Sequence, residues 1–380
     1  MKLNNDDEQL DKLVRLRELM IQRNLDACIL RRTASLAWIR AGARTYVNTA
    51  NGEGPVSAII TADRHCILTN EIEYPRLRDE EHMERAGWEV FVDPWYRPAT
   101  PVADRLEALG VHRTDARIGY DGVPDTQGMT DVSIGAQIAR LRSRLCPAER
   151  TRAAALGADC AEAMLDACTD VQPGQTEQEI AASIWTHTQR RGVQAIVNLV
   201  ACDERIHRYR HPLPTENRLQ RHAMLVLSGR RQGLVVSMTR IMHFGQPPDE
   251  IRARQRAVAS VDAAMIGASV PGATTGRVFD RARDAYAAAG YPDAWRDHHQ
   301  GGVAGYEPRE FLALPDAGDI LADGMLCSWN PSLPGTKSED TILVDSNGPH
   351  VLTATVGWPE IHAHDPETGV TITRPDILIR

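Results

Sequence analysis

The chain of 380 residues lacks several features that mark large classes of protein. It has no apolar run of about 18 residues, so we expect no membrane-spanning helix. Its net charge of −8 lacks the surplus of lysine and arginine that phosphate contacts need, which argues against nucleic-acid binding. The start, MKLNNDDEQLDKL, has no apolar segment typical of a secretory signal, so a cytoplasmic protein is expected.

Cysteine and lysine are also scarce. The seven cysteines are scattered and form no Cys-x-x-Cys pair, so we expect reduced thiols packed as small apolar side chains. Of the 43 basic residues only three are lysines, at positions 2, 12 and 337. The first two belong to an amphipathic stretch, whereas Lys337 stands alone in a turn-rich loop.

The first 145 residues alternate between helical and strand-like segments. Apolar residues recur at helical spacing over 8–23 and predict an amphipathic helix. Further helices are expected near 73–86 and 101–109. Short apolar runs predict strands at 27–31, 57–61, 65–69, 88–92 and 117–121. This alternation predicts a small α/β domain over 1–145.

From residue 146 the pattern changes to pairs of helices followed by strands. Thr176 and Glu179 form a Thr-x-x-Glu capping box that opens the second of these helices. The other helices are expected at 147–169, 248–267 and 274–288, and the strands at 195–200, 223–228, 233–238, 324–328, 340–344 and 350–353. The repeated order predicts an α+β domain over 146–380 with internal pseudo-symmetry.

Three segments of this second domain resemble motifs of the creatinase and aminopeptidase P superfamily, also called M24. They are PGQTEQEI at 173–180, GGVAGYEPRE at 301–310 and KSEDTILV at 337–344. With the tail GWP at 357–359, the resemblance spans 147–360. It implies a C-terminal pita-bread domain and a smaller N-terminal α/β domain of the creatinase type.

Peptidases of this superfamily hold two metal ions with two Asp, one His and two Glu. The resemblance carries these five positions onto Leu227 or Ser228, Ser237, Gly302, Asn330 and Glu339. A single carboxylate cannot hold two divalent ions, so we expect no metal and no other cofactor. The alternative is a metal bound by unmatched carboxylates, with Asp203, Glu204 and Glu307 as candidates.

The catalytic residues expected from the resemblance are His211, His298 and Glu339. His211 matches a histidine that creatinase uses, and imidazole can pass a proton between water and a leaving nitrogen. His298 is preferred to His299 because adjacent residues in an extended loop point to opposite sides. Glu339 is expected to bind a cationic group or to orient His211.

Further residues are expected to bind the substrate. Arg309 either clamps a carboxylate or forms an internal ion pair with Glu339 or Glu310. Lys337 either supplies a compact charge to the site or is an ordinary surface lysine. Trp329 either stacks on a planar substrate or packs in the core. The remaining candidates are Ser237, Asn330, Arg44 and Tyr46.

The residues together predict a metal-independent hydrolase of a non-peptide C–N bond. The expected substrate is a small polar molecule that carries a carboxylate, such as an amidine, a ureido compound, a cyclic amidine or an amide. A homodimer is expected, with the N-terminal domain of one protomer, including Arg44 and Tyr46, near the active site of its partner. Three alternatives stay open: a metal-dependent Xaa-Pro aminopeptidase or dipeptidase, a catalytically inactive binding protein, and a metal-free lyase.

Overall fold

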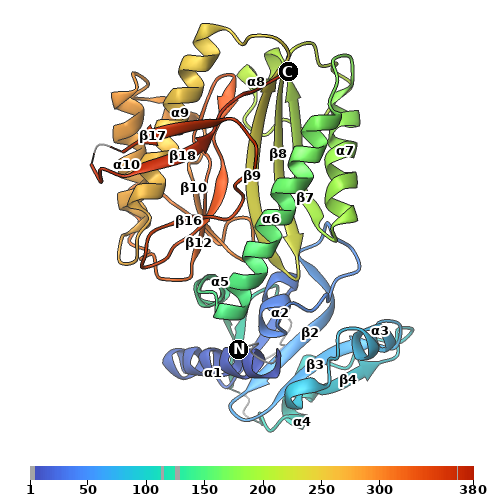
Figure 1. The fold of residues 1–380 in the computed structure, drawn as a ribbon. Coiled ribbons are helices and arrows are strands. Elements are labelled where there is room, and N and C mark those ends of the chain that lie inside the picture. The colour runs from blue at the N-terminus through green and yellow to red at the C-terminus, as the bar shows by residue number, and fades with distance from the viewer. Residues whose placement is uncertain (1–4, 113–114, 125–128, 366) are drawn as a thin grey trace. The chain divides into compact units, whose positions relative to one another are not determined.

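The computed structural model describes residues 5–112, 115–124, 129–365 and 367–380, which divide into two compact units. The units are Met1–Arg142 and Ser143–Arg380, so the division lies close to the boundary expected after residue 145. The family resemblance predicted two domains of these kinds, a smaller α/β domain and a larger pita-bread domain (Figure 1).

The N-terminal unit contains one mixed sheet with the strand order β4-β3-β2-β1-β5-β6. The strands are β1 (Ala27–Arg32), β2 (Glu53–Thr61), β3 (His65–Asn70), β4 (Glu89–Asp93), β5 (Arg117–Tyr120) and β6 (Thr130–Ser133). The helices are α1 (Asn5–Arg23), α2 (Thr33–Ile39), α3 (Tyr74–Asp79), α4 (Val102–Ala108) and α5 (Gly135–Ser143). Apolar residues from the sheet and α4, among them Ile29, Ile59 and Leu106, form its core.

One predicted helix of this unit is wrong. The segment 73–86 contains only the short helix α3 and the start of the 3-10 turn η1 (Arg85–Gly87). His82 and Ala86 both have positive φ angles, of 51° and 57°, which an α-helix does not allow. The chain therefore turns twice within the stretch where a continuous helix was expected.

The C-terminal unit begins with two helices that pack on a long sheet, which is antiparallel except for its short parallel edge strand β19. The helices are α6 (Pro147–Asp170) and α7 (Glu177–Arg190), and the capping box of α7 forms with Thr176 and Glu179 as expected. The sheet has the order β19-β9-β8-β7, with β7 (Gln194–Cys202), β8 (His222–Arg231), β9 (Leu234–His243) and β19 (Leu378–Ile379). The turn between β8 and β9 lies at Gln232-Gly233, later than the segment 229–232 suggested, because both residues adopt positive φ angles.

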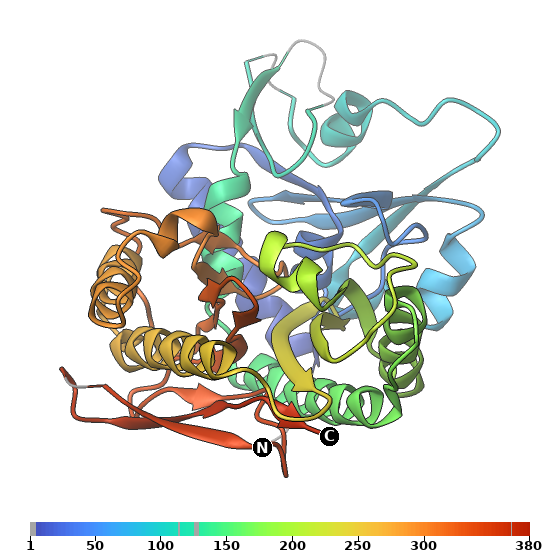
Figure 2. The ribbon, with the colours of Figure 1, turned by 90° about the horizontal axis from the view of Figure 1, so that it is seen from above.

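A second helix pair and a second sheet follow. The helices α9 (Asp249–Ala268) and α10 (Thr275–Ala288) enclose a core with the sheet β11-β10-β12-β15-β16. Its strands are β10 (Gly301–Ala304), β11 (Phe311–Leu312), β12 (Leu326–Trp329), β15 (Asp340–Leu343) and β16 (His350–Val351). Within this unit, α9 and α10 group on one side and α6 and α7 on the other (Figure 2).

Several short elements complete the unit. They are α8 (Glu204–Arg208), η2 (Ala294–Asp297), β13 (Ser332–Leu333), β14 (Thr336–Lys337), β17 (Glu360–His364) and β18 (Thr371–Pro375). The β17–β18 hairpin contacts α9 and was missed, because histidines and threonines alternate there with few apolar residues. Within the described residues, none of the helices has the length and apolarity to cross a membrane.

Candidate active site

The expected site residues of the C-terminal unit gather where its two sheets meet. The backbone N–H of Thr239 on β9 donates to the carbonyl of Glu339, 3.0 Å away, and so joins β9 to the segment that leads into β15. Asn330 follows β12, and Arg309 precedes β11. Loops therefore carry most of the polar groups, while the strands fix their positions.

Glu339 is a buried carboxylate held between a buried cation, Lys337, and a half-buried one, Arg309. Its Oε2 lies 2.6 Å from Lys337 Nζ, and its Oε1 lies 3.1 Å from Arg309 Nη2. The hydroxyl of Thr239 also donates to Oε2, at 2.7 Å. Lys337 and Glu339 are each only 4% exposed, which excludes an ordinary surface lysine. Arg309 forms the internal ion pair, and its partner is Glu339, whereas Glu310 accepts from the backbone N–H groups of residues 306 and 307.

This arrangement keeps the carboxylate ionised. Burial raises the pKa of Glu339, but Lys337 and Arg309 outweigh burial and lower that pKa to about 2. For Lys337 the effects are reversed: burial lowers its pKa, and the charge of Glu339 raises it. Two cations thus share one carboxylate, which leaves an excess positive charge at this point of the site.

Two of the five family ligand positions are serines that bond to each other. Ser228 on β8 and Ser237 on β9 are paired in register, and their Oγ atoms are 2.8 Å apart. Leu227 instead pairs with Met238, so Ser228 is the residue that shares the side of Ser237. Neutral hydroxyls therefore stand where the peptidases have two aspartates.

The third and fourth positions also lack a metal-binding group. A Cβ added to Gly302 would lie 2.2 Å from the backbone oxygen of Phe311, so this strand has no room for a histidine. Asn330 is 1% exposed, accepts from Arg309 Nη2 at 2.9 Å and donates to the carbonyl of His299 at 2.9 Å. Both groups of its amide are therefore engaged within the protein.

The dinuclear centre of the superfamily does not fit these residues. Glu339 is the one carboxylate at the five positions, and both of its oxygens already contact cations. Two of the three alternative ligands are engaged elsewhere as well: Asp203 accepts three backbone N–H groups at residues 220–222, and Glu204 pairs with Arg208. The donor set is therefore wrong for two divalent ions.

Three histidines form a compact cluster beside this ion-pair group. The ring centroid of His211 lies 4.9 Å from that of His298 and 5.6 Å from that of His299. The rings of His298 and His299 are 4.7 Å apart, so the expectation that only one of them faces the site is wrong. Strand alternation does not apply here, because the two residues lie in the irregular segment between η2 and β10. The feature of the sequence that could have pointed to His299 is its position directly after His298.

All three imidazoles are neutral at pH 7. Burial is the main reason, and it lowers the pKa of His298 to about 2 and that of His299 to about 4. The positive charge of Lys337 lowers both pKa values further, and that of Arg309 lowers the pKa of His299. The pKa of the more exposed His211 is also lowered, by burial and then by Lys337.

The loop that carries His211 is anchored by Glu177, at the start of α7. The buried carboxylate of Glu177 accepts from the backbone N–H of Thr215 at 2.9 Å, from its hydroxyl at 2.7 Å and from the N–H of Cys202 at 2.8 Å. It also pairs with Arg205. No role was predicted for Glu177, since its partners are distant in sequence.

Three other expected residues lie differently. Trp329 is fully buried in the core, where its indole N–H donates to Ser269 Oγ at 2.9 Å, so the stacking role is wrong and the core role holds. Arg44 and Tyr46 belong to the N-terminal unit, in which Arg44 Nε pairs with Glu81 at 2.7 Å. Their part in the site stays a prediction.

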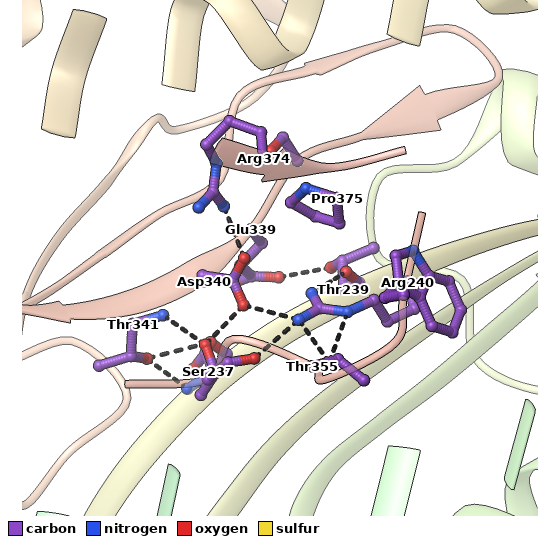
Figure 3. Close-up of polar contacts among 12 residues, drawn as sticks. Ser237, Thr239, Arg240, Glu339, Asp340, Thr341, Thr355, Arg374 and Pro375 are labelled. Carbon is purple, nitrogen blue, oxygen red and sulfur yellow. Dashed lines mark hydrogen bonds and ion pairs between the residues drawn. The ribbon is translucent and has the colours of Figure 1, made fainter. Parts of the chain in front are cut away.

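Asp340, the neighbour of Glu339, belongs to a different polar group. It is bound by Arg240 at 3.0 Å and by Arg374 at 2.6 Å, as Figure 3 shows, whereas Glu339 faces Thr239. A cavity of about 730 Å³ lies on this side, lined by Arg240, Asp340 and Trp358 among others. None of the expected site residues lines that cavity, so its volume says nothing about the candidate site.

Comparison with known proteins identifies the family. The profile of metallopeptidase family M24 matches residues 151–346. The Xaa-Pro dipeptidase of Pyrococcus furiosus is 22% identical over 367 residues, which cover 92% of this chain and 98% of the relative. A dipeptidase of Mycobacterium ulcerans superposes with a TM-score of 0.77 at 19% identity, covering 98% of both chains. An Xaa-Pro dipeptidase from Bacillus anthracis gives 0.76 at 18% identity and covers 98% of this chain and all of that one.

These relatives correct the expected function. Proteins similar to this chain over nearly its full length are named Xaa-Pro dipeptidases, so the metal-independent hydrolase of a non-peptide C–N bond is wrong as the main interpretation. The expected superfamily and fold are confirmed. The chain belongs to metallopeptidase family M24, a family of hydrolases.

Proposed function

We propose that the chain is a dipeptidase that acts on Xaa-Pro dipeptides. The observation that carries the proposal is the joint presence of a cluster of three neutral imidazoles and the Lys337–Glu339–Arg309 group, in which Glu339 is the family ligand position that keeps its carboxylate. The similarity to proteins named Xaa-Pro dipeptidases supports peptides as the substrate class. In the reaction the amide C–N bond breaks, the carbonyl carbon gains a hydroxyl group from water, and the proline nitrogen gains the proton.

The two cations beside Glu339 suit the charges of this reaction. The carbonyl oxygen becomes negative when water adds, and a free dipeptide also carries a C-terminal carboxylate. Lys337 and Arg309 together carry one more positive charge than Glu339 balances, so a negative group near them is stabilised. The imidazoles, neutral at pH 7, offer lone pairs that can take a proton or bind a metal ion.

The direct test is the release of proline from a series of Xaa-Pro dipeptides. We expect hydrolysis by the purified chain, with Zn²⁺, Co²⁺ or Mn²⁺ supplied one at a time, and a loss of at least tenfold in kcat/KM for His211→Ala. The variant His362→Ala, which removes an exposed histidine of the β17–β18 hairpin, is the matched control and should retain activity. Absence of hydrolysis by the wild type under all these conditions would overturn the proposal.

A binding protein without catalysis is the second candidate. The observation that favours it is that both oxygens of Glu339 are engaged by fixed cations, so the carboxylate has lost the freedom that it has as a metal ligand. Calorimetric titration with an Xaa-Pro dipeptide separates the two. Binding that is unchanged by incubation, with no proline released, identifies this second candidate.

We also propose a cytoplasmic homodimer with a small-molecule substrate, in which the N-terminal domain of one protomer contributes Arg44 and Tyr46 to the site of its partner. Light scattering on the purified chain should give twice the monomer mass of 42.0 kDa. Mixing Arg44→Ala with His211→Ala should restore part of the activity, because mixed dimers contain one intact site. A monomeric mass would contradict this arrangement.

A further inference from the structure

Three histidine rings of the C-terminal unit converge on one point. Their candidate ligand atoms, one from each of His211, His298 and His299, all lie within 4.8 Å of one another. The Nε2 atoms of His211 and His298 are 3.2 Å apart. Two nitrogens that bind one tetrahedral zinc ion at about 2.0 to 2.1 Å are separated by roughly the same distance.

We propose that His211, His298 and His299 bind a single zinc-like transition-metal ion, at a place different from the family's dinuclear centre. The five family positions cannot bind this ion, because Ser228, Gly302 and Asn330 offer no anionic ligand. Imidazole nitrogen suits Zn²⁺, Co²⁺, Ni²⁺ and Cu²⁺ and is a poor ligand for Mg²⁺ and Ca²⁺. Three protein ligands leave the fourth tetrahedral position open for water or substrate.

The orientation of His298 supports the proposal. Its Nδ1 is joined to Ser332 Oγ at 3.1 Å, and its Nε2 faces His211 Nε2 at 3.2 Å and the Asn330 amide nitrogen at 3.3 Å. A hydrogen bond on the far nitrogen is what fixes the tautomer of histidines that bind metals. His298 is 8% exposed, so its ring is also held by packing.

His299 supplies an independent observation. Its Nδ1 is buried and has no hydrogen-bond partner among the residues that the structure describes. A buried polar atom without a hydrogen-bond partner destabilises the folded chain. A bound ion at the centre of the cluster would give this ring a partner.

Access and charge define the kind of site. His211 is exposed, so an ion can reach the cluster from solvent without a large cavity. Lys337 and Arg309 repel a cation, and Glu339 cancels one of these two charges. The affinity is therefore lower than at a carboxylate-rich zinc site. The same cations favour a negatively charged fourth ligand, such as the carboxylate of a peptide.

The inference deepens the proposed peptidase function and rests on it only for the use of the ion. Its test is calorimetric titration of the chelator-treated full chain with Zn²⁺, which needs no activity. We expect one ion per chain, with the affinity reduced at least tenfold by His211→Ala and again by His299→Ala. His362→Ala and Ser228→Ala should bind zinc as the wild type does, because one lies on the distant hairpin and the other at a family position.

A charge variant sharpens the test. Lys337→Met removes one repelling cation and should tighten zinc binding severalfold, provided that circular dichroism shows a folded chain. No zinc binding by the wild type, or binding that His211→Ala and His299→Ala leave unchanged, would overturn the inference. Zinc bound at the histidines without proline release would instead refute only the proposed peptidase function.

Discussion

Glu339 is the buried carboxylate on which the two site cations depend. Replacing it by Gln removes the carboxylate that pairs with the buried Lys337 and the half-buried Arg309. We expect Glu339→Gln to lower the free energy of unfolding by about 3 to 5 kcal/mol in urea titrations. Adding Lys337→Met to Glu339→Gln should recover part of this loss, and a single variant as stable as the wild type would refute the ion-pair account.

Gly302 occupies the position of the family's histidine ligand and leaves no room for a side chain. A Cβ at this position meets the backbone oxygen of Phe311 at 2.2 Å, so Gly302→Ala should destabilise the chain by about 3 kcal/mol or more. Gly318→Ala is the matched control, since no atom lies within 4 Å of its added Cβ, and it should change the stability by no more than about 0.5 kcal/mol. Equal thermal midpoints for the two variants would show that β10 can shift.

At this scale the sequence predicted the chemistry of the site better than its geometry. The isolated Lys337 and the carried-over Glu339 were expected, and their ion pair joins two residues only two positions apart. His299 was set aside because strand alternation was assumed for a segment that is irregular. Whether Arg309 pairs with Glu339 or Glu310 depends on folding around β11 and could not be decided from the chain alone.

Helix α7 controls the histidine loop through its first residue. Glu177→Gln keeps the size of the side chain but removes the charge that accepts from Thr215, Cys202 and Arg205. We expect a loss of about 3 kcal/mol in the free energy of unfolding. Hydrogen exchange should also become faster at the amides of Thr215 and Cys202, while the amides of α10 are unchanged. Unaltered exchange at Thr215 would show that Glu177 does not hold the histidine loop in place.

Strand β8 begins with a histidine that makes stability depend on pH. Burial, followed by the charges of neighbouring histidines, lowers the pKa of His222 to about 4 from an unfolded value of about 6.5. Between these values the unfolded chain binds more protons, so the stability falls as the pH drops from about 6.5 to 4. His222 alone changes the free energy of unfolding by up to about 1.4 kcal/mol per pH unit in this range.

The variant His222→Gln isolates this contribution. Its stability should decline less steeply than that of the wild type between pH 6.5 and 4, in urea titrations at matched ionic strength. The other titrating groups act equally in both chains and cancel in the difference. Parallel pH profiles for the two proteins would show that His222 is not buried as a neutral group.

The elements were predicted where periodicity was strong. The helix pairs and the β8–β9 hairpin follow the expected order, because their apolar faces pack against each other. The prediction of a helix over 73–86 failed, because a helical pattern of residues does not reveal the two positive φ angles of this segment. The polar β17–β18 hairpin was not predicted, because its two strands, which pair with each other and contact α9, show no alternation of apolar residues.

At the scale of the whole molecule, the resemblance predicted the fold and misjudged the function. The order of three motifs identified the superfamily, and the family profile and full-length relatives confirm it. Counting lost ligands then suggested a new substrate, whereas the relatives are named peptidases. The count could not reveal the histidine cluster, since its members come from two loops that are about 90 residues apart in the chain.

We propose the cluster of His211, His298 and His299 as the reaction centre, beside a carboxylate that is paired with two cations. Anomalous diffraction at the zinc edge, from crystals of the full chain grown with Zn²⁺, tests it most directly. One peak is expected among the three imidazoles, at bonding distance from their nitrogens. A peak, or a pair of peaks, between Ser237 and Glu339 would contradict it.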